Sequence, residues 1–350
     1  MTSETPFEGA TPVAAADPSA SDWVRVLARY RQPDTGRSIF EIAVTLLPFF
    51  AIWGLCFALL SVSPLLSAIL AGANGLFLVR LFCIQHDCGH GSFFSNRRVS
   101  DWVGRGLGVL TLTPYDVWRK SHAMHHSAAG NLGRRGIGDV MTLTVEEYQS
   151  RNWFGRLKYR AYRNPAVLFL LGPAYVFYIE NRLPLGQMNG GWQIWTSSAG
   201  TTLGVLAILL GILWLGGLTA ALFIFVPTTL VAATLGVWLF YVQHQFEVTH
   251  WDQPDDWDVH EAALHGSSHY VMPRWLQWFT ANIGIHHVHH LYSRIPFYRL
   301  TEVLRDHRTL AEAQKLSIAE SIACARLHLW DEKQRRLLSF AEARRTYAFA

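Results

Sequence analysis

The sequence predicts an all-α integral membrane protein, with four transmembrane helices in two hairpins, interfacial helices, and a cytoplasmic helical cap that carries a metal site. Three observations support this class. Half of the 350 residues are hydrophobic and only 16% are charged, whereas a typical soluble domain has about a quarter of charged residues. Four long apolar runs occur in two pairs, and sixteen histidines, many of them clustered, lie outside these runs.

The four apolar runs are the candidate membrane spans. They cover approximately residues 39–60, 64–84, 199–215 and 218–241. A helix needs about 20 apolar residues to cross a bilayer, and only the third run is short by that measure. Uncharged connectors at residues 61–63 and 216–217 join the runs pairwise. Each pair is therefore expected to form a tight transmembrane hairpin.

The placement of positive charge predicts the orientation of these hairpins. Basic residues precede the first hairpin and follow it: Arg25, Arg29, Arg31 and Arg37 come before, and Arg97, Arg98, Arg105, Arg119, Lys120, Arg134 and Arg135 come after. Because Lys and Arg gather on the cytoplasmic side of a membrane, we expect both termini and the segment between the hairpins to lie in the cytoplasm.

Outside the spans the chain divides into a tail and a cap. Residues 1–21 are rich in Ala, Pro, Ser and Thr and lack the apolar core of a signal peptide, so a disordered cytoplasmic tail is expected. Residues 22–350 are expected to form a single domain, whose cytoplasmic cap comprises residues 85–198 and 242–350. Two shorter apolar stretches, residues 102–115 and 165–179, are interpreted as interfacial helices; the alternative is that one of them is a re-entrant segment or a short span. The modest net charge of +4 does not suggest a nucleic-acid partner.

Three histidine clusters have the spacing of metal ligands. Their sequences are HDCGH at residues 86–90, HAMHH at residues 122–126 and HHVHH at residues 286–290. Residues three and four apart share one face of a helix, and neutral imidazole is the commonest protein ligand for transition metals. Eight imidazoles on three converging elements are too many for one ion, so two ions are expected. A single pair of this spacing would be weak evidence, and the isolated His307 and His328 are interpreted as surface residues.

The order of these clusters between two transmembrane hairpins resembles the membrane fatty acid desaturase family. The stretches Tyr241–Glu247 and Asn282–Ile285 are similar to bacterial acyl-lipid desaturases of the omega-6, or delta-12, type. The resemblance covers approximately residues 40–300 and implies a centre of two iron ions with histidine ligands. Carried over by motif, these ligands are His86, His90, His122, His125, His126, His286, His289 and His290. The family has a further ligand just after the last span, and His244 matches that position.

Several other polar residues are candidates for the surroundings of the metal site. His265 and His269 form a second pair of helical spacing and are the alternatives to His244. His287 occupies a variable position of the third cluster and is expected to lie beside the ligands or to face solvent. Asp87 and Glu247 are candidates to orient ligand imidazoles through the second ring nitrogen, the alternative being ordinary surface carboxylates.

Asn282, which precedes the third cluster, is a further candidate near the ligands. His250 and His260 are interpreted as loop residues. No catalytic residue is expected beyond the metal ligands.

The resemblance implies an O2-dependent desaturase that leaves a cis double bond in a lipid-linked fatty acyl chain, in a bacterial inner membrane with the active site in the cytoplasm. Breaking an unactivated C–H bond requires a strong oxidant, which iron and O2 supply. The four cysteines form no ferredoxin-like pattern and no dinucleotide-binding GxGxxG context is present, so an external electron donor such as ferredoxin is expected. The expected partners are therefore the acyl lipid, membrane lipid and that donor.

Three alternatives stay open at this point. A fatty acid or carotenoid hydroxylase or ketolase would use the same scaffold. A metal transporter is also rich in histidine and spans the membrane, but its ligands should lie within the spans. A third alternative is an inactive sensor on this fold. The double-bond position, the chain length and the acyl carrier (glycerolipid, CoA or acyl carrier protein) do not follow from the sequence.

Overall fold

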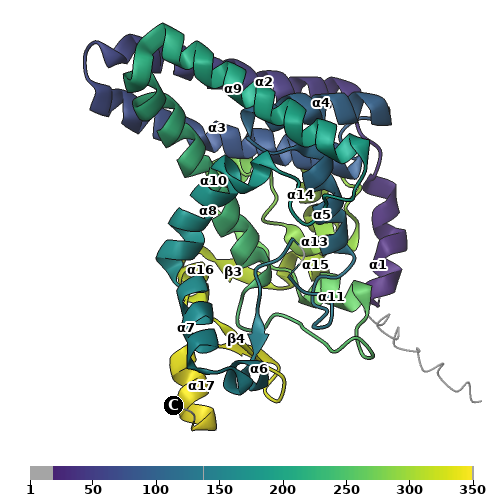
Figure 1. Cartoon of the computed structure of the whole chain (residues 1–350). Helices are drawn as coiled ribbons and strands as arrows, with labels where there is room; N and C mark the ends of the chain where they lie inside the picture. Colours follow the sequence, from purple (N-terminus) through teal and green to yellow (C-terminus); the bar gives the residue numbers. More distant parts are fainter. Residues whose placement is uncertain (1–18, 137, 349–350) are drawn as a thin grey trace, which may run out of the picture.

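A computed structural model describes residues 19–136 and 138–348 of the chain. Four long helices form one bundle: α2 (Thr35–Leu60), α3 (Pro64–His90), α9 (Trp192–Ala220) and α10 (Val226–His244). In Figure 1, α2, α3 and α9 lie together at the top, and α10 descends from them into the lower part of the molecule. Helix α3 is central, because it packs against both α2 and α10.

Three helical segments of the described chain are long and apolar enough to cross a membrane: residues 35–60, 64–90 and 192–244. The third segment comprises α9, a π-helical turn at Ala221–Phe225 and α10, and it is interrupted at Gly217, whose φ of 64° lies in the left-handed region that favours glycine. All four predicted runs fall within these segments. Large apolar side chains point outward from them: Leu47 is 71% exposed and Trp214 is 86% exposed. Such a surface fits lipid better than water.

Sequence signals explain where the first two long helices begin and end. The Asp34 and Ser63 side chains cap α2 and α3 by accepting hydrogen bonds from backbone N–H groups. Pro64 occupies the first turn of α3, and Gly91 ends that helix with a φ of 68°. Helix α3 therefore continues six residues beyond the predicted span, and this extension carries the first histidine cluster.

Close contacts and buried polar groups hold the bundle together. A Cβ added at Gly75 of α3 would lie 2.9 Å from the Thr228 carbonyl oxygen of α10, so glycine permits this close approach. The Asn74 side-chain amide donates to the Phe49 carbonyl at 3.0 Å, and the Trp53 indole donates to the Thr228 hydroxyl at 3.0 Å. Each bond satisfies a polar group within the apolar bundle.

The rest of the described chain forms a mainly helical cap. Its helices are α1 (Ala20–Leu27), α4 (Arg97–Leu110), α5 (Tyr115–His126), α6 (Val145–Ser150), α7 (Trp153–Tyr162), α8 (Gly172–Tyr178), α11 (Val259–His265), α12 (Arg274–Phe279), α13 (His286–Leu291), α14 (Leu300–Asp306), α15 (Arg308–Glu312), α16 (Ile318–Cys324) and α17 (Phe340–Tyr347). The first predicted interfacial stretch corresponds to α4 and the turn after it, and the second to a π-helical turn at Val167–Leu171 followed by α8. The predicted tail, residues 1–21, lies mostly outside the described residues, and its last residues form the N-cap and first turn of α1.

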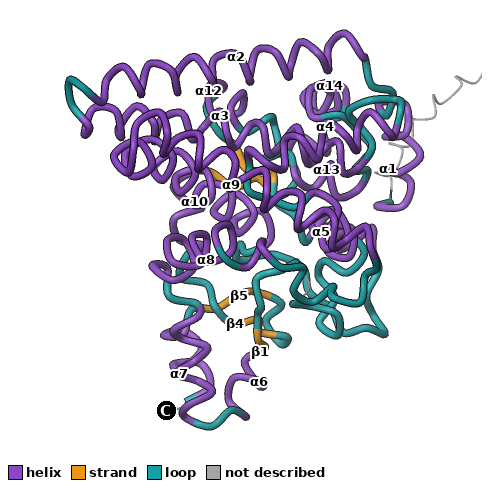
Figure 2. The backbone as a smooth tube through the Cα atoms, turned by 45° about the horizontal axis from the view of Figure 1, so that its top comes forward, coloured by secondary structure: helices purple, strands orange, loops and turns teal. Residues whose placement is uncertain are grey.

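The described chain also contains five short strands, and Figure 2 colours strands orange. A three-stranded sheet has the order β1 (Leu143–Thr144), β4 (Leu329–Asp331), β5 (Arg336–Leu338), with β1 parallel and β5 antiparallel to β4. Two parallel strands, β2 (His269–Val271) and β3 (Lys315–Ser317), pair in register His269 to Lys315. The three-stranded sheet joins the two parts of the cap that the second helical hairpin separates in sequence, whereas β2 and β3 both belong to the second part. The expectation of a helical architecture without a substantial sheet agrees with this structure.

Candidate metal centre

The nine predicted ligand histidines come from four helices that meet below the bundle. His86 and His90 lie on the last turn of α3, and His244 is the last residue of α10. The others lie on α5 (His122, His125 and His126) and on α13 (His286, His289 and His290). Because α3 and α10 leave the bundle side by side, their terminal histidines are presented at one level to the two short cap helices.

The structure arranges these histidines in two neighbouring groups. One group contains His86, His90, His122, His126 and His289, and the other contains His125, His244, His286 and His290. Within each group one ring nitrogen per residue lies within 4.8 Å of all the others. The groups adjoin, since the rings of His126 and His290 stack with their centroids 4.0 Å apart. The structure therefore brings all nine predicted residues together in two sets.

Ring nitrogens face one another at the centre of each group. The Nε2 atom of His126 lies 3.1 Å from those of His122 and His289. In the second group, the Nε2 atom of His244 lies 3.1 Å from those of His125 and His286. Imidazoles that converge through the same atom from different helices are typical of a ligand set, because a metal ion accepts imidazole nitrogens at roughly 2 Å.

The donor set fits transition-metal ions. The Nε2 atoms of His86, His90 and His290 are buried and have no hydrogen-bond partner among the described residues, and a buried nitrogen without a partner is costly unless something binds it. Burial, together with the neighbouring imidazoles, holds the pKa of His126 and of His289 well below the usual value. These rings are therefore neutral at pH 7 and offer a lone pair, which is the form that binds metal.

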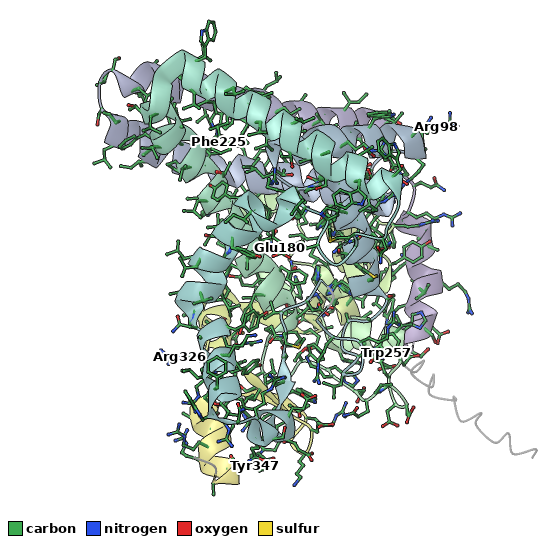
Figure 3. All side chains as sticks on the ribbon, viewed as in Figure 1. Arg98, Glu180, Phe225, Trp257, Arg326 and Tyr347 are labelled. Carbon is green, nitrogen blue, oxygen red and sulfur yellow. The ribbon has the colours of Figure 1, made fainter. Side chains whose placement is uncertain are left out.

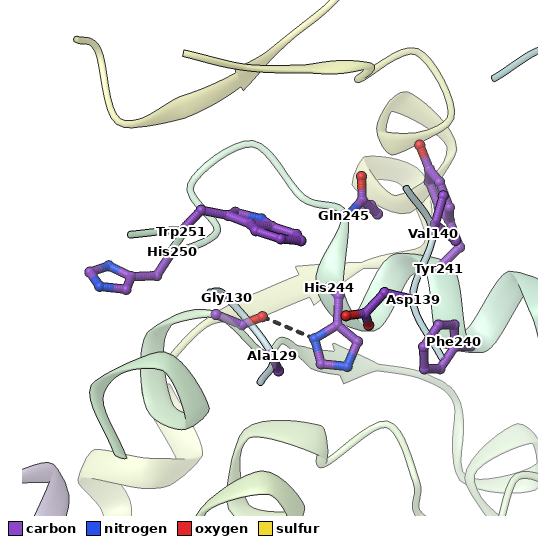
Figure 4. A pocket seen from close by; sticks show the side chains of 11 residues that line it. Ala129, Gly130, Asp139, Val140, Phe240, Tyr241, His244, Gln245, His250 and Trp251 are labelled. Atoms are coloured by element: carbon purple, nitrogen blue, oxygen red, sulfur yellow. Dashed lines mark hydrogen bonds between the residues drawn. The ribbon is translucent and has the colours of Figure 1, made fainter. Parts of the chain in front are cut away.

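Three groups accept hydrogen bonds from the second nitrogen of ligand-set histidines. The Asp139 carboxylate lies 2.5 Å from Nδ1 of His125, and the Asp87 carboxylate lies 3.3 Å from Nδ1 of His86. The Gly266 carbonyl oxygen lies 3.2 Å from Nδ1 of His244; Figure 4 draws this bond and shows His244 next to Asp139. Such partners fix the ring orientation and direct Nε2 toward the metal.

Asp87 lies where a partner of His86 was predicted, and its orienting role stays a prediction, whereas Asp139 and Gly266 were not identified from the sequence. Asp87 is also held in place, because it accepts a 2.7 Å hydrogen bond from the Phe297 backbone N–H. The only sequence signal for Asp139 is a carboxylate thirteen residues after the second cluster, in a glycine-rich stretch.

The other candidates lie away from the two groups. Glu247 does not orient a ligand histidine: its carboxylate is exposed and pairs with Arg336 at 2.9 Å. The Asn282 side chain donates to the Phe297 carbonyl at 3.2 Å. His287 is fully buried rather than facing solvent, with its Nε2 atom 2.8 Å from the Leu310 carbonyl oxygen.

The alternatives to His244 belong to neither group. The Nδ1 atom of His269 lies 3.1 Å from the Ala311 carbonyl oxygen, and that of His265 lies 3.2 Å from the Gln314 amide. Both rings therefore have partners in the chain segment around α15 and β3. The position of His244, with its Nε2 atom facing His125 and His286, favours it over both.

An apolar cavity of about 270 Å³ opens beside the histidines. Its walls include Leu78, Val79 and Phe82 of α3 and the small residues Ala232, Ala233 and Gly236 of α10, while His86, His122 and His286 line one end. The lining residues of α10 extend from Thr229 to Gln243, which is roughly 20 Å of helix. The length and apolar walls of this cavity suit a long apolar molecule with one part beside the two histidine groups.

Comparison with known proteins identifies the family. A fatty acid desaturase family model matches residues 60–321. The chain is 39% identical over 314 residues to a fatty acid desaturase from Bacillus subtilis, covering 90% of this chain and 89% of the relative. It is 26% identical over 246 residues to an sn-1 oleoyl-lipid 12-desaturase from Arthrospira platensis, covering 65% and 64%.

A third relative is an sn-1 acyl-lipid omega-3 desaturase (ferredoxin) from Synechocystis, 28% identical over 244 residues and covering 65% of this chain and 63% of the relative. The apolar helices and this family identify a membrane protein, and the histidine groups are suited to metal. The chain belongs to the fatty acid desaturase family and is an oxidoreductase that desaturates fatty acyl chains.

Proposed function

We propose that this desaturase removes two hydrogens from adjacent carbons of a lipid-linked acyl chain, leaving a cis double bond, in a reaction that consumes O2. The observation that carries the proposal is the apolar cavity whose end is lined by His86, His122 and His286. The hydrocarbon core of one leaflet is roughly 15 Å thick, so a cavity along roughly 20 Å of α10 accommodates a whole acyl chain. Relatives with names that specify acyl-lipid substrates support the same substrate class.

We also propose that the nine histidines hold two iron ions, one in each group. The support is the division of the nine residues into two sets and the unpartnered buried Nε2 atoms. Iron supplies, when bound, the oxidising chemistry with O2 that an unactivated C–H bond requires. The chain's own contribution is to keep its imidazoles neutral, to fix them through Asp139, Asp87 and the Gly266 carbonyl, and to surround the acyl chain with apolar walls.

Burial of the acyl chain's apolar surface is sufficient for the cavity to bind substrate. Each methylene group that leaves water contributes about 0.8 kcal/mol, so apolar walls bind a long chain without specific polar contacts. The polar ring of His86 and the Trp118 indole stand at the same end of the cavity, with ring centroids 5.7 Å apart. The acyl carbons beside these rings are the ones that we expect to be desaturated.

The proposal includes four membrane spans with both termini in the cytoplasm of a bacterial inner membrane, and an external donor such as ferredoxin. The break at Gly217 divides the segment 192–244 into two helices of membrane-spanning length, which supports four spans. The two hairpin connectors carry no charge, which supports their location on the side of the membrane opposite to the cytoplasm. A relative named as ferredoxin-dependent supports the choice of donor.

The test is expression in a bacterial host rich in monounsaturated lipid, followed by mass spectrometry of the fatty acids. We expect a new product lighter by two hydrogens. A product heavier by one oxygen would instead identify a hydroxylase on the same scaffold. A matched pair of variants links the product to the site: His126→Ala should abolish it, whereas His260→Ala, which changes a histidine outside both groups, should leave it unchanged.

A further inference from the structure

A second cleft lies between α7 and α17, away from the histidines. Its volume is about 650 Å³, and its lining includes Arg160, Arg163, His328, Phe340, Arg344 and Arg345. No acidic residue is among the residues that line it. Figure 1 shows α7 and α17 in one column below α8, at the end of the cap farthest from α2 and α9. The cleft is therefore separate from the acyl cavity and strongly basic.

Arg163 forms the inner wall of this cleft and is fully buried. Its guanidinium donates to neutral acceptors only: the carbonyls of Met141 and Leu327, the hydroxyls of Thr142 and Tyr241, and the side-chain carbonyl of Gln245, at 2.8–3.2 Å. Its Nε atom has no partner, and no described carboxylate forms an ion pair with it. A buried charge is costly when nothing of opposite sign compensates it, so Arg163 makes an anion in the cleft favourable.

The rim of the cleft adds three further cations, Arg160, Arg344 and Arg345, around the buried Arg163. Arg160 is held by a 2.6 Å hydrogen bond to the Tyr148 hydroxyl and lies over the Phe340 ring. Arg344 and Arg345 are exposed on α17. The carboxylate on that helix, Glu342, accepts a hydrogen bond from the Ser339 hydroxyl at 2.7 Å and so helps to cap the start of the helix. Arginine forks match the geometry of phosphate oxygens.

The inner surface also contains an unused polar atom on an aromatic support. The His328 ring stacks on Phe340 with centroids 4.2 Å apart. Its Nδ1 atom is buried and has no hydrogen-bond partner in the described part of the chain. This nitrogen and Nε of Arg163 therefore lie as two unpartnered polar atoms just behind the wall of the cleft.

The neighbouring surface favours a lipid over a soluble anion. Trp153, Phe154 and Leu157 of α7 are 74%, 60% and 53% exposed. Trp153 and Leu157 precede Arg160 by seven and three residues, so they lie along the same face of the helix. Leu170 and Leu171, which follow the cleft residues Asn164 and Pro165, are also more than half exposed. Exposed Trp, Phe and Leu side chains on a helix that also has arginines fit a membrane interface, where apolar residues insert and basic residues meet anionic headgroups.

We propose that this cleft binds the phosphate of an anionic phospholipid, with the apolar residues of α7 inserted among the adjacent acyl chains. Arg160, Arg344 and Arg345 contact the phosphate at the surface of the cleft, and the buried Arg163 behind the wall contributes its uncompensated positive charge. The site anchors the distal end of the cap to the membrane. The inference rests on the membrane location of the protein and is independent of the desaturation reaction.

Native mass spectrometry of the full, detergent-purified protein tests this site with palmitoyl-oleoyl phosphatidylglycerol. The comparison probes are phosphatidylcholine with the same acyl chains and inorganic phosphate. The test variant is Arg344→Gln/Arg345→Gln. The control is Arg31→Gln/Arg98→Gln, which removes the same charge from exposed positions outside the cleft. Arg98 and Tyr347, the latter on α17, lie at opposite ends of the molecule in Figure 3.

We expect the wild type to prefer phosphatidylglycerol. The test variant should bind this lipid about tenfold more weakly, because each arginine near an anionic headgroup contributes to the binding free energy. The control variant should keep wild-type binding, and thermal unfolding should be alike for all three proteins. Equal weakening in both variants, or equal binding of both lipids by the wild type, would overturn the proposal. Displacement of the lipid by inorganic phosphate at similar concentration would also overturn it, by assigning the site to a soluble anion.

Discussion

The His244 imidazole stands where α5, α10 and α13 meet, with its Nε2 atom 3.1 Å from the Nε2 atoms of both His125 and His286. Replacing His244 by alanine removes the ring nitrogen that faces both of these histidines at the centre of the second group. We therefore expect His244→Ala to abolish desaturation and to lower bound iron. His265→Ala and His269→Ala should stay largely active, because both residues belong to neither group. Iron analysis and product mass spectrometry check this, and the reverse pattern would move the ninth ligand to the segment before the third cluster.

Asp139 contacts His125 and can influence the proposed iron only through that ring, so its replacement should affect metal retention before it affects folding. Losing such a partner typically costs about 10- to 100-fold in metal affinity. Asp139→Asn is expected to lower the affinity for iron by that factor, measured by competition with a chelator. Glu247→Gln is the matched control, since that carboxylate pairs with Arg336 at the surface, and equal loss in both variants would contradict the role of Asp139.

The sequence predicted the ligand histidines, but it did not predict the groups that accept hydrogen bonds from two of them. Spacings of three and four residues place His122, His125 and His126 on one helical face, which is a local property of the sequence. The Asp139 carboxylate and the Gly266 carbonyl reach their histidines only through the fold of irregular segments. Glu247 follows His244 by three residues, but its side chain points toward β5, because α10 ends at His244.

Helix α10 forms one wall of the acyl cavity through small residues, and Gly236 has open space where a Cβ would lie. A leucine there adds four carbon atoms and would occupy the volume of about four methylenes of substrate, which contribute roughly 3 kcal/mol, or about 200-fold in binding. We expect Gly236→Leu to weaken use of long acyl chains by about that factor with unchanged iron content. Gly54→Leu, at an open and exposed position on α2, should leave activity unchanged.

The hairpin connectors provide a test of topology, because all four native cysteines are buried. Val62→Cys and Leu218→Cys place thiols at sites 75% and 66% exposed. In intact cells these thiols should react with a membrane-impermeant maleimide, whereas Glu332→Cys in the cap should react only after lysis. Labelling of the cap thiol in intact cells, with protection of the connectors, would reverse the orientation.

Long elements were easier to predict than short ones. The apolar runs are intrinsic signals, so the three long apolar segments of the described chain contain all four predicted runs. Strands β1 and β4 have two and three residues and pair across nearly 190 positions, which leaves no alternating pattern to detect. The polar first turns of α9 also extend beyond the predicted run, because they pack on α4 and α5 rather than in lipid.

For the whole molecule, the division of nine histidines into groups of five and four predicts its metal content. Purified active protein should contain close to two irons per chain by elemental analysis. Removing them should lower the melting temperature, since ions that join α3, α5, α10 and α13 stabilise only the folded chain. Full activity with one iron, or with zinc alone, would contradict a di-iron centre, whereas zinc in an inactive preparation would not.

The positions of these histidines along the chain also determine when each group can be completed during translation. The first hairpin and His86 leave the ribosome roughly 200 residues before His290, a delay of about 10–40 s at bacterial or slower translation rates. During that interval α3 is already in place while its partners on α13 do not yet exist. Both histidine groups require α13, so neither can be completed on a nascent chain that ends before it. For the proposed iron ions, we therefore expect loading to be completed only after α13 has been synthesised.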